Sequence, residues 1–170
     1  MTRKQLYWSI GLTAVMITAG IIIYHRKRIK KKLTEAGDTA EGWIRPVVAK
    51  ITSKFGHRTD PKTGKTNTFH NGIDLAVPSG TPIKSPMPGI VETVQSGGAG
   101  GNEIIIKHIN GYKTGYAHLS KVLVTKGDGV KQGDLIAYSG NTGKSTGPHL
   151  HFTLTAPTGV KVDPQKMIYS

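Results

Sequence analysis

The chain has 170 residues, enough for one globular domain with an appendage. It contains no cysteine, which excludes disulfides and thiolate ligands, so a metal ion must be held by nitrogen and oxygen. The formal net charge is +13, and a basic surface suits anionic polymers or lipid headgroups. Nucleic acid is not an expected partner. No nucleic-acid-binding motif is present, and two Trp, six Tyr and three Phe offer no obvious base-stacking platform.

The first element is an uncharged segment from Leu6 to Tyr24. As a helix it would be about 28 Å long, close to the roughly 30 Å hydrocarbon core of a bilayer. A secretory signal peptide is the alternative, but its apolar region is usually shorter and is followed directly by a small-residue cleavage site. Here the apolar run meets a basic stretch that begins at His25. We therefore expect residues 1–32 to form an uncleaved, single-pass membrane anchor.

A polar linker is expected over residues 33–45, because Glu35 to Gly42 is polar and contains two glycines. Trp43 either packs on the following domain or lies at the membrane interface, and the sequence leaves both open. The remaining residues, 46–170, form the expected globular domain.

Short runs with β propensity alternate with glycine-marked turns in this domain, and helical periodicity is scarce. The runs are Gly89 to Gln95, Asn102 to Ile109, Tyr112 to Leu119, Leu135 to Ser139 and Leu150 to Ala156. This spacing predicts an all-β antiparallel domain with a sheet or barrel-like arrangement. The glycine-rich segment Ser96 to Gly101 is interpreted as a hairpin connection, with the wall of a groove as the alternative.

Four histidines and one aspartate carry the strongest chemical signal. They are His70 and Asp74, His118, and His149 and His151. An even spacing places His149 and His151 on one face of a strand, and the same holds for His70 and Asp74. Zinc accepts imidazole nitrogen and carboxylate oxygen, and a catalytic site typically has three protein ligands and one open position. Three of these residues would therefore be ligands, and the remaining two would be acid/base groups.

The stretch from about Ile51 to Leu154 resembles the catalytic domain of the M23 peptidases, the lysostaphin/LytM-type peptidoglycan endopeptidases. The matching motifs are Ser53 to Arg58, Asp60 to Gly64, His70 to Ala76, Gly80 to Ile83, Gly89 to Val91, Tyr116 to Ser120, Gly140 to Gly143 and Gly147 to Phe152. A small departure is Thr153, where a glutamate often follows the His-x-His-Phe run.

The resemblance implies a zinc endopeptidase that hydrolyses peptide bonds in bacterial peptidoglycan. It assigns the zinc ligands to His70, Asp74 and His151, and the catalytic histidines to His118 and His149. Some M23-like domains have lost ligands and bind or activate other hydrolases, which leaves a non-catalytic wall-binding or activating module as the alternative. All five residues are present here, and this favours the enzyme.

The distribution of charge raises a question of location. Six Lys or Arg residues follow the expected span and only Arg3 and Lys4 precede it, a bias that places the domain in the cytoplasm, away from peptidoglycan. Either the bias is overridden and the domain faces the cell envelope, or the membrane belongs to a virion. We therefore also consider a virion-associated lytic enzyme of a membrane-containing bacteriophage.

Overall fold

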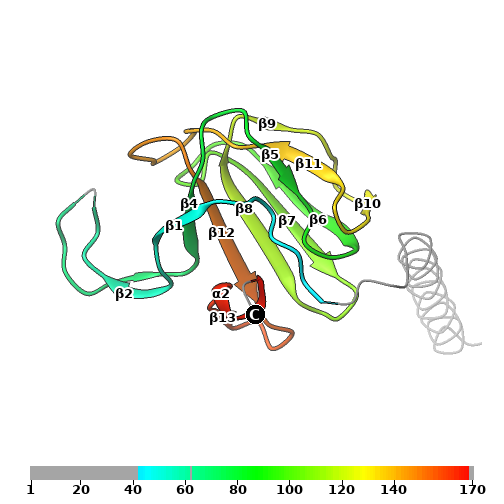
Figure 1. Cartoon of the computed structure of the whole chain (residues 1–170), viewed down its shortest axis with the longest axis horizontal. Helices are drawn as coiled ribbons and strands as arrows, with labels where there is room; N and C mark the ends of the chain where they lie inside the picture. Colours follow the sequence, from blue (N-terminus) through cyan, green and yellow to red (C-terminus); the bar gives the residue numbers. More distant parts are fainter. Residues whose placement is uncertain (1–41, 62, 169–170) are drawn as a thin grey trace, which may run out of the picture.

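The computed structural model describes residues 42–61 and 63–168, which fold into antiparallel β-sheets (Figure 1). The elements are β1 (Lys50–Ser53), β2 (Gly56–Arg58), β3 (Thr68–His70), β4 (Ile73–Ala76), β5 (Pro82–Lys84), β6 (Gly89–Gln95), β7 (Asn102–His108), β8 (Lys113–Leu119), β9 (Lys121–Val122), β10 (Gly129–Val130), β11 (Leu135–Tyr138), β12 (Leu150–Thr155), β13 (Lys161–Val162) and the short helix α2 (Gln165–Ile168). All five expected strands form, and none of their ends moves by more than one residue.

The large sheet has the strand order β1-β4-β12-β8-β7-β6-β10, with β13 beside the end of β12. A three-stranded sheet, β5-β11-β9, and the hairpin β2-β3 complete the described part of the chain. Every pairing is antiparallel, which confirms the predicted all-β antiparallel class. The large sheet is an open path from β1 to β10. In Figure 1 the β2-β3 hairpin extends away from it on the side of β1 and β4.

One face of the large sheet packs into the core. Because side chains alternate along a strand, Leu150, Phe152 and Leu154 of β12 are buried on the same face. Leu150 and Phe152 join a single hydrophobic cluster with Ile104 of β7 and with Ile136 of the three-stranded sheet. The core therefore includes side chains from both sheets.

The opposite face of the large sheet presents the intervening residues. Strand pairing aligns Asp74 of β4 with His151 of β12, and His151 with Ala117 of β8. On β7, Glu103 lies between the pairs Asn102–Leu119 and Ile104–Tyr116, so it continues this row on the next strand. The pairing register thus places chemically active side chains side by side across the outer surface of the sheet.

The N-terminal end of the described chain contacts the domain. The Trp43 ring packs edge-on against His108, with 5.2 Å between ring centroids, and against Tyr112. The backbone N–H of Ile44 donates to the Pro86 carbonyl. Of the two positions left open for Trp43, the structure therefore has it packed on the domain. Among the described residues no helix is long and apolar enough to cross a membrane, and the expected span, residues 6–24, lies outside them.

Candidate metal centre and active site

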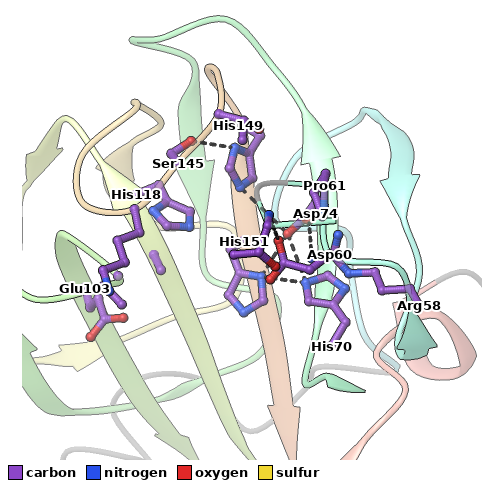
Figure 2. Close-up of a pocket in the computed structure, with 16 residues that line it drawn as sticks. Arg58, Asp60, Pro61, His70, Asp74, Glu103, His118, Ser145, His149 and His151 are labelled. Carbon is purple, nitrogen blue, oxygen red and sulfur yellow. Dashed lines mark hydrogen bonds and ion pairs between the residues drawn. The ribbon is translucent and has the colours of Figure 1, made fainter. Parts of the chain in front are cut away.

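Three side chains from three strands converge on the outer face of the large sheet (Figure 2). The atoms involved are His70 Nε2 from the end of β3, Asp74 Oδ1 from β4, and His151 Nδ1 from β12. Asp74 Oδ1 lies 3.2 Å from His70 Nε2 and 2.8 Å from His151 Nδ1, and the two nitrogens are 3.1 Å apart. In a tetrahedral zinc site with bonds of about 2.1 Å, two ligand atoms are about 3.4 Å apart. The triangle in this structure is only slightly smaller.

Hydrogen bonds at the far side of each imidazole determine which nitrogen is free. His70 Nδ1–H donates to the Lys54 carbonyl at 2.8 Å, and His151 Nε2–H donates to Asn71 Oδ1 at 3.1 Å. In their neutral forms, both histidines therefore direct a lone pair at the Asp74 carboxylate. Three acceptors in mutual contact repel one another unless a cation lies between them. The donor set thus fits a zinc ion, with each histidine oriented by an outer hydrogen bond.

The Asp74 carboxylate is held ionised. Burial raises its pKa, but in the metal-free protein hydrogen bonds and charge interactions with His151 and His70, in the forms in which these rings carry a proton toward Asp74, outweigh this effect, so the pKa lies well below its usual range. A metal cation between the three groups would take the place of those protons. Arg58 of β2 contributes from the other side, because its guanidinium lies 3.6 Å from Asp74 Oδ2. This ion pair leaves Oδ1 for the histidine pair.

His118 and His149 form a second pair beside the triangle, on the same side of it in Figure 2. Their ring centroids are 4.6 Å apart. His118 Nδ1–H donates to the Thr142 carbonyl and His149 Nδ1–H to the Gly147 carbonyl, both at 2.8 Å. Each Nε2 is thereby left free, and that of His149 lies 3.7 Å from Asp74 Oδ1.

Burial lowers the pKa of His118, and the neighbouring His149 and His151 lower it further, against the opposing influence of the Thr142 carbonyl and Asp74. The neutral imidazole is thus favoured at neutral pH, which suits a group that has to accept a proton.

A bulge in β8 directs His118 toward the site. Two residues of β8, Ala117 and His118, face the single residue Glu103 of β7. His118 has a φ of 62°, a left-handed conformation that is uncommon for a residue with a side chain. Its backbone N–H donates to the Gly100 carbonyl at 2.7 Å. The bulge breaks the alternation of β8 and brings the imidazole beside His149.

A groove of about 480 Å³ contains all five predicted site residues. The β2-β3 hairpin lines one end with Arg58 and Asp60, and the connection between β6 and β7 lines the other with Ala99 and Gly100. The glycine-rich segment Ser96 to Gly101 is therefore a hairpin connection, as predicted, and also a wall of the groove.

The structure brings together all five residues that the sequence singled out, and their division into ligands and catalytic groups stays a prediction. One geometric expectation differs, since His70 and Asp74 do not share a strand: His70 ends β3 and Asp74 lies in β4. The sequence assigned no role to Arg58, Glu103 or Asn71. Arg58 and Asn71 lie inside the matched motifs, and this position could have identified them as site residues.

An antiparallel sheet with a His-Asp-His cluster and two further imidazoles in an open groove is the architecture of a metallopeptidase. The model of Peptidase family M23 matches residues 68–164. The chain belongs to this family.

Two curated peptidases are similar to this chain over most of its globular domain. The chain is 45% identical over 105 residues to the peptidoglycan DD-endopeptidase ShyA of Vibrio cholerae, a match that covers 62% of this chain and 24% of ShyA. It is 43% identical over 110 residues to the DD-carboxypeptidase/endopeptidase Mpg of Neisseria meningitidis, covering 64% and 25% of the two chains. The match thus spans about a quarter of the length of these curated relatives.

Solved structures of peptidases are also similar to this chain. A zinc-containing peptidase from Vibrio cholerae superposes with a TM-score of 0.66 at 42% identity, over 72% of this chain and 39% of the other. The catalytic domain of lysostaphin from Staphylococcus simulans superposes with a TM-score of 0.64 at 33% identity, over 72% and 93% of the two chains.

Proposed function

We propose that the protein is a zinc metalloendopeptidase that hydrolyses peptide bonds in bacterial peptidoglycan. The observation that carries the proposal is the convergence of His70 Nε2, Asp74 Oδ1 and His151 Nδ1, with no donor among them, directly beside the free Nε2 of His149. Peptidoglycan is the expected substrate because two of the compared relatives are endopeptidases and one of these is named for peptidoglycan.

The five site residues divide into three that would hold the metal and two that transfer protons. His70, Asp74 and His151 would hold the metal. When bound, zinc would activate a water molecule and polarise the scissile carbonyl. One imidazole of the pair His118 and His149 accepts a proton from the attacking water at Nε2 and passes it to the amine that leaves when the peptide bond breaks. The other, protonated at Nε2, donates to the developing oxyanion. Backbone carbonyls hold both rings through Nδ1–H, so neither ring has to reorient during the reaction.

The test is digestion of purified peptidoglycan by the full chain, with mass spectrometry of the released muropeptides. Glycine-bridged and directly cross-linked walls are digested separately, with and without a chelator. We expect new amine ends that vanish with chelator and return with zinc, and that are absent for Asp74→Ala. A protein that binds zinc yet cleaves neither wall would instead be a non-catalytic wall-binding or activating module.

We also propose that residues 6–24 anchor the enzyme in a membrane as a single-pass helix, on the strength of their length and lack of charge. Expression of the full chain followed by alkaline carbonate extraction tests this. The protein should stay in the membrane pellet, and Val15→Arg at the middle of the span should release a substantial fraction, because a central arginine costs roughly 3 kcal/mol. Complete extraction of the unmodified chain would refute the anchor.

The location that we propose is a membrane, either in the cell envelope of a bacterium or in a bacteriophage virion, and the charge distribution bears on the virion. Support comes from the six basic residues after the span against two before it, which place the domain on the cytoplasmic side. A vesicle that buds inward from the host membrane would carry this side outward, toward the wall of the next host. Detection of the protein only in cellular envelopes, and not in purified virions, would exclude the virion.

A further inference from the structure

Glu103 lies at the end of the groove away from the β2-β3 hairpin. Figure 2 shows it on the His118 side of the site, with Arg58 and His70 on the opposite side. It occupies the outer-face row that also contains Asp74 and His151. Two strand spacings separate β12 from β7, or about 10 Å. An extended peptide spans this distance in about three residues.

The three acidic residues that line the groove differ in the groups with which their carboxylates interact. Asp74 belongs to the candidate metal centre, and Asp60 Oδ1 accepts the backbone N–H of Thr63 within its own turn. The Glu103 carboxylate accepts a hydrogen bond from the neutral side chain of Gln95 on β6. None of the ion pairs within the described ranges includes Glu103.

Lys161 of β13 is a cation that responds to the charge of Glu103. Its ammonium donates to Thr153 Oγ1 at 3.1 Å, and burial lowers its pKa while the charge of Glu103 acts in the opposite direction. This through-space interaction leaves Glu103 without a hydrogen-bonded counter-charge among the described residues. A carboxylate in a substrate groove with only a neutral hydrogen-bond partner is suited to receive a cationic group.

The Glu103 carboxylate lies against Gly100. A Cβ atom built on Gly100 would fall 1.4 Å from Glu103 Oε1, so the side chain of Glu103 lies directly against this glycine. The Gly100 carbonyl also accepts the backbone N–H of His118. The bulge that directs His118 and the position of Glu103 are thus linked through one residue.

We propose that Glu103 is a specificity-determining residue that binds a primary ammonium group of the peptide substrate, on the His118 side of the scissile bond. The inference rests on the proposed endopeptidase function and specifies its substrate class as a peptide with a free amine about three residues' length or less from the bond that is cut.

The test compares soluble cross-linked muropeptides that carry a free primary amine with the same muropeptides after N-acetylation, which removes the charge. The zinc-loaded full chain is assayed by mass spectrometry, and kcat/KM is compared with that of Glu103→Gln. Acetylation should lower kcat/KM of the unmodified chain about tenfold, mainly through KM, as expected for a charged hydrogen bond in a partly open groove. Glu103→Gln should lose about as much on the free-amine substrate and respond less than twofold to acetylation.

Two further variants sharpen the comparison. Gly100→Ala displaces the carboxylate without removing it and should reproduce the Glu103→Gln pattern, because the three atoms nearest to the new methyl group all belong to the flexible side chain of Glu103. Glu92→Gln removes an acid from neighbouring β6 that pairs with Lys113 outside the groove, and it should keep the full acetylation effect.

The outcomes are distinguishable. Equal sensitivity to acetylation in the unmodified chain and in Glu103→Gln would overturn the inference while the endopeptidase function stands. A lower melting temperature for Glu103→Gln with unchanged amine dependence would overturn the inference and show that Glu103 stabilises the fold through its interaction with Lys161. Absence of any chelator-sensitive cleavage by the unmodified chain would overturn both proposals.

Discussion

Asn71 Oδ1 accepts the Nε2–H of His151 at 3.1 Å, and this bond leaves His151 Nδ1 directed at Asp74. Asn71 is exposed and follows His70 directly in the chain, so the residue beside one candidate ligand orients another ligand 80 positions away. The amide therefore acts as an outer partner that selects the tautomer of a ligand.

Replacing Asn71 should weaken zinc binding without unfolding the domain. Asn71→Ala removes the acceptor, so the ring of His151 can rotate or adopt the other tautomer, and zinc affinity should fall about tenfold to a hundredfold. Asn71→Asp keeps an oxygen acceptor and should stay within a few-fold of the unmodified chain. Competition with a chromogenic chelator measures both values. Unchanged affinity in Asn71→Ala would mean that the contact is incidental.

The division of the five site residues predicts two kinds of variant. His118→Ala and His149→Ala should retain zinc but lose turnover by roughly two orders of magnitude or more, because general acid–base groups contribute on this scale. Asp74→Ala should lose the metal, since one of the three converging atoms is gone. Metal content by mass spectrometry and turnover on muropeptides separate the two classes. Equal zinc loss in all three variants would contradict the division of roles.

Gly72 is required for close packing between the metal-binding strands. A Cβ at this position would lie 2.4 Å from the Phe152 carbonyl oxygen and 3.0 Å from His151 Cε1. Because the oxygen belongs to the backbone of β12, relief requires a shift of the strand that carries His151. We expect Gly72→Ala to lower the free energy of unfolding by about 2 kcal/mol and to weaken zinc binding.

The matched control is Gly147→Ala, because a Cβ at Gly147 meets no atom within 4 Å. Chemical denaturation of the metal-free protein should place this control within about 0.5 kcal/mol of the unmodified chain. Equal stability of both glycine variants would show that β12 accommodates the methyl group without cost.

Much of the candidate site could be predicted from residue type and from spacing over a few residues. Alternation along a strand predicted that His149 and His151 lie on one face, and both line the groove, while the motif match indicated that His118 belongs to the same site. These features depend on residue type and local spacing, which a sequence displays directly.

The parts that could not be predicted depend on long-range register. Glu103 enters the groove because a bulge sets it against Ala117 and His118, and the sequence of β7 gives no sign of that pairing. The ion pair of Arg58 with Asp74 likewise depends on where the β2-β3 hairpin lies relative to β4. The packing of Trp43 on His108 was open for the same reason, since either a membrane or a domain could cover an indole.

His108 belongs to a buried polar chain on the core side of the sheet. Its Nδ1–H donates to the Pro88 carbonyl at 3.2 Å, and its Nε2 accepts the Thr114 hydroxyl at 2.7 Å. The Thr114 oxygen in turn accepts the hydroxyl of Tyr116 at 2.8 Å. Every group is satisfied when the imidazole is neutral. A second proton at Nε2 would face a hydroxyl that already donates there.

Burial accordingly lowers the pKa of His108 to about 4, against an ordinary value of 6.5. Between these two pH values the unfolded chain binds more protons at this residue than the folded chain, so stability falls as the pH is lowered from about 6.5 toward 4. The loss attributable to His108 should approach 3 kcal/mol at pH 4. His108→Gln does not titrate, and its free energy of unfolding should fall less steeply over this window. Urea denaturation of the metal-free proteins at several pH values gives both slopes. Parallel slopes would mean that His108 is protonated in the folded protein and that the chain of hydrogen bonds rearranges to accept the charge.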